Sequence, residues 1–200
     1  SLSKKEIANT YIGSISRCRT KQIFLSISPF SSYKQTHLIF EAFYQFASIN
    51  HSAELIHVGR PLDIPYYQSI IAGIPLSLRN RISIFTDFVP DITMENLFRD
   101  SFSYISMSKC ESFGLPAIEA QCFGVPSIVL TGTAAEEICG SGALIVQESS
   151  SLSLCDAMHK LAADPDLHSR LSHNALANST RYTSPDNSQA LLDAINSMLS

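Results

Sequence analysis

The stretch CESFGLPAIEAQCFGVP, residues 110–126, decides how this sequence is interpreted. It follows a short apolar run, SYISMS (103–108), that has the composition of a strand buried on both faces. The sequence then predicts a helix that opens near Pro116, because proline is tolerated at the first helical position, and that closes at Gly124. The stretch is therefore a strand–loop–helix unit.

Two carboxylates belong to this unit. Glu111 falls in the loop at the carboxyl end of the strand, and Glu119 falls within about one turn of the helix start. Ligands of open parallel sheets bind at the carboxyl ends of the strands, where the N–H groups of residues 113 to 117 would form an anion-accepting surface. Carboxylates beside such a surface suit a nucleotide sugar, since they accept hydrogen bonds from hydroxyl groups. Acids near a helix N-terminus are also stabilising by about 0.3–1 kcal/mol without any function, so the spacing alone leaves both interpretations open.

Apolar, β-rich runs alternate with helical patterns along the rest of the chain. Strands are predicted at 23–28, 54–59, 82–87, 103–108, 126–131 and 143–146. Helices are predicted at 36–50, 66–74, 94–101, 115–123, 150–163, 165–178 and 187–199. This order predicts an α/β fold, a Rossmann-like parallel sheet with helices on both faces, preceded by a linker or N-terminal extension over residues 1–21.

The composition excludes several classes of function. The chain has 200 residues, 45% of them hydrophobic, with 14 Lys and Arg against 18 Asp and Glu, which argues against a basic nucleic-acid-binding face. The five cysteines are scattered and never form C-x-x-C, as is typical of thiols in a cytoplasmic protein. The six histidines lack the spacing of a zinc site, so we expect no metal. No apolar run reaches the ~18 residues of a membrane-spanning helix.

Several linked segments resemble one known family. The segment SKCESFGLPAIEAQCFGVPSIVLTG (108–132) closely resembles the E-x7-E signature of retaining GT-B glycosyltransferases of glycosyltransferase family 4. SYKQTHLIFEAFYQF (32–46) is similar to the family's segment after the first strand, and AEEICGSGALIV (135–146) to a later one. Residues 81–108 and 181–199 also match in order. The resemblance covers residues 22 to 199.

The resemblance implies that residues 22–200 form the C-terminal, nucleotide-sugar-binding half of a GT-B fold. By the same resemblance, the residues that match the family's functional positions are Glu111 as the catalytic carboxylate beside the donor sugar, Lys34, Phe113, Gly114 and Leu115 at the sugar and diphosphate, Glu119 at the ribose, and Phe88 and Val89, next to Asp87, at the base.

The implied reaction is the transfer of a glycosyl unit, with retention of configuration, from a UDP- or GDP-type sugar to a glycan, lipid-linked or other acceptor. Such a hexosyltransferase of polysaccharide biosynthesis needs no metal or other cofactor. We expect the chain to be part of a longer cytoplasmic enzyme, active only with an N-terminal acceptor domain. That missing part could also associate peripherally with the inner face of the membrane.

The chain departs from the family pattern after the first strand. Where the family usually has Gly-Arg, this chain has Ser28 and Pro29, so one of two phosphate-binding cations is absent. Arg60 or Lys109 could compensate, although both residue types are commonly plain surface charges.

Two further departures concern the sugar side of the site. Ser112 replaces the glycine after the first glutamate, and Glu137 aligns with a family glutamate but lacks the proline before it. Two alternatives to such an enzyme stay open, the first of them favoured by Ser28 and Pro29. One is a catalytically degenerate GT-B-like module with an assembly or regulatory role in a larger polysaccharide-synthesising protein. The other is a GT-B-fold epimerase or phosphorylase.

Overall fold

The computed structural model describes residues 21–183. Its strands are β1 (Gln22–Ile27), β2 (Ala53–Val58), β3 (Ile82–Phe85), β4 (Ser103–Ser106), β5 (Ser127–Leu130) and β6 (Ala143–Val146). Its α-helices are α2 (Thr36–Ala47), α3 (Ile64–Gly73), α4 (Asp91–Asp100), α5 (Leu115–Cys122), α6 (Ala134–Cys139), α7 (Ser151–Ala163) and α8 (Pro165–Thr183). Short 3₁₀ turns cover Ser32–Lys34, Leu76–Arg81 and Gly140–Gly142.

The six strands form one parallel sheet in the order β3-β2-β1-β4-β5-β6. The order reverses between β1 and β4, where Phe24 pairs with Ser103 and Leu25 with Tyr104. This reversal is the switch point of the sheet, and the carboxyl ends of β1 and β4 are the edge at which ligands of such sheets generally bind. The predicted α/β, Rossmann-like fold is confirmed.

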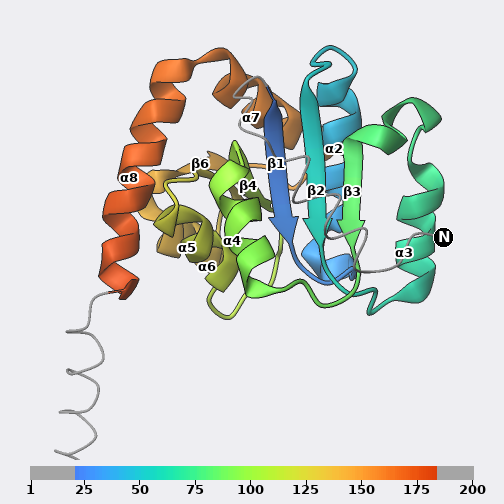
Figure 1. Cartoon of the computed structure of the whole chain (residues 1–200), viewed down its shortest axis with the longest axis horizontal. Coiled ribbons are helices and arrows are strands. Elements are labelled where there is room, and N and C mark those ends of the chain that lie inside the picture. The colour runs from blue at the N-terminus through green and yellow to red at the C-terminus, as the bar shows by residue number, and fades with distance from the viewer. Residues whose placement is uncertain (1–20, 184–200) are drawn as a thin grey trace, which may run out of the picture.

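Alternate residues of each strand enter two separate cores. Phe24 and Leu55 pack on one face with α2, α3 and α7, whereas Leu25 and Ile56 pack on the other with α4, α5 and α6. Burial on both faces explains why these strands are apolar without strict alternation. Figure 1 shows α3 beyond β3 at one side of the molecule and α8 along the opposite side.

The six predicted strands are present, and most boundaries move by one or two residues. Helix α3 begins before its predicted start because Asp63 caps it: the Asp63 carboxylate accepts a hydrogen bond from Tyr66 N at 3.0 Å. The six-residue helix α6 was not predicted, since so short a segment shows little periodicity. The predicted helix 187–199 and residues 1–20 lie outside the described residues.

His57 is a polar residue that is fully buried among apolar side chains. Its ring is fully buried in β2, edge-on to Phe30 and Phe40 at centroid distances of 4.5 and 5.7 Å. Burial lowers the pKa of His57 to about 4, against a weaker opposing effect of the Ser28 backbone. His57 is therefore a neutral core residue at physiological pH.

Candidate functional site

An ion pair joins the loops that follow β1 and β4 at the switch point. Lys34 ends the 3₁₀ turn after β1, and Glu111 lies in the loop after β4. The Lys34 Nζ is 2.8 Å from Glu111 Oε1, and the two side chains are only 11% and 19% exposed. The same Nζ donates a hydrogen bond to the carbonyl oxygen of Cys110 at 3.3 Å. The structure thus brings together two residues that the sequence placed in the candidate site.

One further hydrogen bond joins these loops, and another holds the loop after β4 internally. The amide of Lys109 donates to the Tyr33 carbonyl at 3.0 Å, and the Ser108 hydroxyl donates to the Cys110 carbonyl at 2.9 Å. The Lys34 Nζ also lies 5.3 Å from the centroid of the Tyr33 ring, within the range of a cation–π contact. The ion pair is therefore held by its surroundings as well as by its own charges.

The start of α5 offers unused hydrogen-bond donors beside this pair. Gly114 precedes the helix with φ of 91°, a left-handed conformation that glycine adopts without strain. Within residues 21–183, the N–H groups of Phe113, Gly114 and Leu115 donate to no other group. Pro116 has no N–H, and the Ala117 amide donates to the Gly114 carbonyl at 3.0 Å. The expected surface of residues 113 to 117 is therefore wrong at its last two positions and consists of three amides.

Glu119 lies in α5 in a different electrostatic state from Glu111. Its side chain is exposed, and within the described part of the chain its carboxylate makes no hydrogen bond or ion pair. Partial desolvation nevertheless raises the pKa of Glu119 above its ordinary value. The carboxylate is thus available to a ligand.

A buried tyrosine that the sequence did not single out lies near both glutamates. Tyr104, in β4, donates a long hydrogen bond from its hydroxyl to the Ile27 carbonyl at 3.4 Å. Burial raises the pKa of Tyr104, and the charges of Glu111 and Glu119 raise it further. Both carboxylates therefore lie within electrostatic reach of one phenol, on the α4–α6 side of the sheet.

The loop predicted to contact the base lies farther along the same edge. Phe88 is 86% exposed, and Val89 packs, partly buried, against the core on the α4–α6 face of the sheet. β3, which precedes this loop, is three strand spacings from β4, or roughly 14 Å at ~4.8 Å per spacing. Within the described residues, no hydrogen bond or ion pair connects Phe88 or Val89 with Lys34, Glu111 or Glu119.

The loop that lacks the family's arginine lies against the end of β2. The ladder continues past the strands, with Ser28 N donating to Val58 O at 3.0 Å and Phe30 N donating to Arg60 O at 2.9 Å. A Cβ on Gly59 would lie 1.8 Å from the Ser28 carbonyl oxygen, so this approach requires glycine. Arg60 is exposed and belongs to no ion pair among residues 21–183. The backbone of Arg60 thus lies beside the loop in which the expected arginine is absent.

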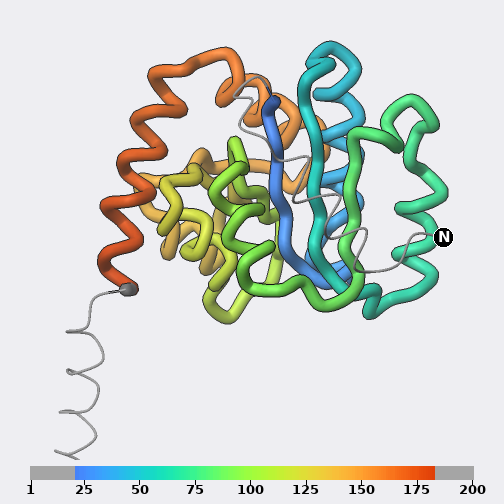
Figure 2. Tube along the Cα trace, in the orientation of Figure 1, coloured from blue at the N-terminus to red at the C-terminus, as the bar shows by residue number. Residues whose placement is uncertain are grey.

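Helix α8 supports α5 at both ends. At the start of α5, Phe113 meets Tyr182 of the last turn of α8 edge to face, with ring centroids 5.8 Å apart. At its far end, the buried Asn178 amide donates to Gln121 Oε1 at 2.7 Å, and the Ser172 hydroxyl donates to the Gly124 carbonyl at 2.6 Å. The course of α8 along this side is visible in Figure 2. No sequence pattern pointed to Tyr182, because the contact is long-range.

In the turn between β5 and α6, Glu136 and not Glu137 accepts the hydrogen bonds. The Glu136 carboxylate accepts hydrogen bonds from Gly132 N at 2.6 Å and from the Thr131 hydroxyl at 3.1 Å. Glu137 is exposed. Glu136 therefore serves the turn itself.

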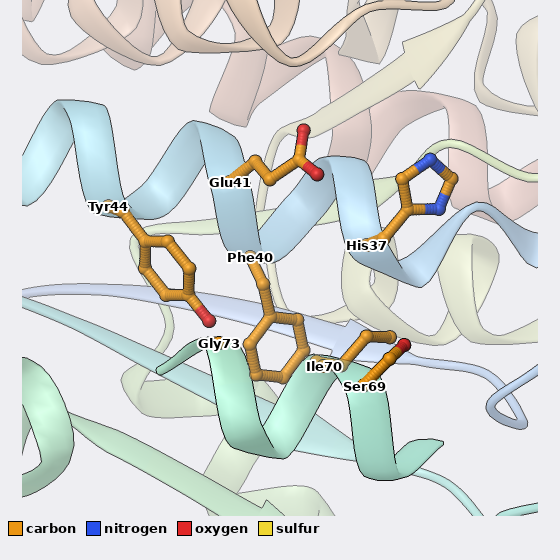
Figure 3. A pocket seen from close by; sticks show the side chains of 7 residues that line it. All are labelled: His37, Phe40, Glu41, Tyr44, Ser69, Ile70 and Gly73. Atoms are coloured by element: carbon orange, nitrogen blue, oxygen red, sulfur yellow. The ribbon is translucent and has the colours of Figure 1, made fainter. Parts of the chain in front are cut away.

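Two cavities lie away from the ion pair. The first, of about 130 Å³, separates α2 from α3 and is drawn in Figure 3; its lining residues are His37, Phe40, Glu41, Tyr44, Ser69, Ile70 and Gly73. The second, of about 350 Å³, is lined by Ile71, Ile74, Arg79, Ile82 and Ile84. Neither cavity includes a residue of the candidate site.

In residues 21–183, no three His, Cys, Asp or Glu side chains are placed to hold a metal ion. No helix in this same part of the chain has the length and apolar character to cross a membrane.

Solved structures with the same fold include glycosyltransferases. The C-terminal domain of a glycosyl transferase group 1 family protein (LpcC) from Francisella tularensis has a TM-score of 0.70 and 21% identity, over 80% of this chain and 86% of that one. Anabaena Alr3699/HepE, solved in complex with UDP and glucose, has a TM-score of 0.79 and 20% identity, over 98% of this chain and 53% of that one. WaaG, a glycosyltransferase of lipopolysaccharide biosynthesis, has a TM-score of 0.69 and 17% identity, over 90% and 47%.

The sequence comparisons define the family. The chain spans about half the length of HepE and WaaG. A comparison with curated proteins found no match. The model of the family described as glycosyl transferases group 1 matches residues 12–178, which is most of the chain. The chain therefore belongs to the glycosyl transferases group 1 family.

Proposed function

We propose that this chain is the nucleotide-sugar-binding domain of a retaining hexosyltransferase, with a UDP- or GDP-sugar as donor and a glycan, lipid-linked or other acceptor. One observation carries the proposal: a lysine and a glutamate form an ion pair at the switch point of a sheet of this family, and the three unused amides follow that glutamate along the chain. The related folds support a nucleotide donor, since HepE was solved with UDP-glucose and S. aureus TarM with UDP.

Each part of the site matches one part of such a donor. The Lys34 ammonium and the amides of Phe113 to Leu115 provide the positive potential that a diphosphate leaving group requires. Glu119 accepts hydrogen bonds from the ribose hydroxyls, and Glu111 lies beside the transferred sugar. The exposed loop at Phe88 is left for the base, and the roughly 14 Å between β3 and β4 suits an extended ligand.

An N-terminal acceptor domain would cover the same edge of the sheet. Large apolar side chains are exposed in the loops and at the first helical turns there, namely Tyr33, Leu62, Ile64, Phe88, Ile92, Phe113 and Leu115. A concentration of such side chains marks a surface that another structure covers. Because this chain spans about half of HepE, we assign this surface to a second domain that binds the acceptor and is needed for transfer.

The donor assignment is tested by titrating UDP, GDP and UDP-glucose into the chain in a calorimeter. The proposal expects binding of at least one nucleotide, and Lys34→Ala is expected to weaken it about tenfold or more because a charge-assisted contact is lost. Lys160→Ala, which removes an exposed lysine of α7, is the matched control and should leave the affinity unchanged.

A catalytically degenerate module is the second candidate, favoured by the loss of the arginine at Ser28 and Pro29. Wild-type protein that binds none of the three nucleotides at millimolar concentration would support that candidate and refute donor binding.

A further inference from the structure

Glu111 already pairs with the cation that a diphosphate would use, the ammonium group of Lys34. An ammonium group has three N–H donors, and Lys34 directs two of them to Glu111 Oε1 at 2.8 Å and to the Cys110 carbonyl at 3.3 Å. Both charged side chains are more than four-fifths buried, so solvent screens their attraction less than it screens a surface pair. In the free chain the Glu111 carboxylate thus stands where an external anion would bind.

An arriving phosphate cannot reach Lys34 without approaching Glu111. A phosphate oxygen bonded to Nζ at about 2.8 Å would lie no more than about 5.6 Å from Glu111 Oε1 while the pair persists. Like charges at such a distance repel each other. The Ser108–Cys110 and Lys109–Tyr33 hydrogen bonds hold the backbone of the loop after β4, so the carboxylate moves away from Lys34 only by rotation of the Glu111 side chain.

We propose that Glu111 competes with the diphosphate for Lys34 and thereby weakens the binding of a nucleoside diphosphate that carries no sugar. This inference rests on the proposed function. A sugar on the diphosphate offers hydroxyl donors to the displaced carboxylate and offsets the lost ion pair. A bare nucleoside diphosphate has hydroxyl groups only on its ribose, which lies at Glu119 in the proposed function, so the pair favours the donor over the product and promotes product release.

Removing the charge of Glu111 should raise the affinity for a nucleotide, although Glu111 is itself a residue of the proposed donor site. In Glu111→Gln, which keeps the size of the side chain, UDP or GDP, whichever the wild type binds tighter, is expected to bind about three- to tenfold tighter. The gain is expected to disappear when Lys34 is also replaced by Met, because the competition acts through that lysine. Glu95→Gln, which removes an exposed charge from α4, is the matched control and should leave affinity within twofold.

The outcomes separate the inference from the function on which it rests. If the wild type binds the nucleotide but Glu111→Gln binds it no tighter, the inference is overturned and the donor site stands. A gain that persists in the Lys34→Met background also overturns it. The tighter binding would then come from the lower negative charge of the chain and not from the release of Lys34. If neither UDP nor GDP binds any variant, the proposed function fails and the inference with it. Thermal melting confirms folding, and Glu111→Ala replaces the glutamine variant if that one does not fold.

Discussion

Glu111 and Glu119 lie eight residues apart on either side of the start of α5, yet their surroundings differ. Glu111 is mostly buried and paired with Lys34, across loops that hydrogen bonds tie together. Glu119 is exposed, and within residues 21–183 no group satisfies its carboxylate. Before a ligand binds, the charge of Glu111 is therefore already paired with Lys34, whereas the Glu119 carboxylate remains available as a hydrogen-bond acceptor.

This difference implies opposite energetic roles for two residues of the same type. A carboxylate with a partner must lose that partner when a diphosphate binds, so it subtracts from affinity. A carboxylate without a partner exchanges only water for ribose hydroxyls, so it adds to affinity. Substitutions at the two positions should therefore change nucleotide affinity in opposite directions.

Of the effects that test this comparison, the largest is expected at Glu119. Glu119→Ala is expected to weaken UDP or GDP binding about 10- to 100-fold, the equivalent of one or two hydrogen bonds to a charged group. Calorimetric titration measures the change, with Glu95→Ala as the control on the neighbouring helix α4. An affinity within twofold of the wild type would remove Glu119 from the site and end the comparison.

The next effect is a dependence on pH. Because desolvation raises the pKa of Glu119, this carboxylate takes up a proton at a higher pH than an ordinary glutamate and then loses its full capacity to accept hydrogen bonds. The advantage of the wild type over Glu119→Gln, about tenfold near neutral pH, is expected to shrink as the pH is lowered.

Measuring both proteins in the same buffers cancels the titration of the ligand phosphates. A ratio of affinities that stays constant across the acid range would show that the ionised form of Glu119 plays no part in binding.

A smaller effect is expected from the far end of α8. The Tyr182 ring restrains Phe113, whose amide is one of the three at the start of α5. Tyr182→Ala is expected to weaken nucleotide binding about two- to tenfold, the range of one aromatic pair, whereas Tyr182→Phe keeps the ring and the affinity. His173→Ala, on an exposed face of α8, is the control. Equal affinities for the alanine and phenylalanine variants would rule out positioning by this contact.

The sequence predicted the sheet and most helices because their signals are local. Pro116 and Gly124 delimit α5, and the apolar runs fit strands buried on both faces. Helix α6 was missed because six residues carry almost no periodic signal, and the cap at Asp63 moved the start of α3.

The candidate site could be predicted only in part. The resemblance named Lys34 and Glu111, and the switch point explains why loops distant in sequence meet there, but no local pattern encodes a 2.8 Å ion pair. The Phe113–Tyr182 contact depends on the path of α8, which sequence periodicity does not specify. The roles at Glu119, Phe88 and Val89 remain predictions.

A crystal structure of the chain with bound UDP or GDP tests the central claim most directly. The expected result places the diphosphate against the Lys34 Nζ and the amides of Phe113 to Leu115, with the ribose at Glu119. A nucleotide found in the cavity between α2 and α3, or none bound at millimolar concentration, would contradict the assignment of the switch point as the donor site.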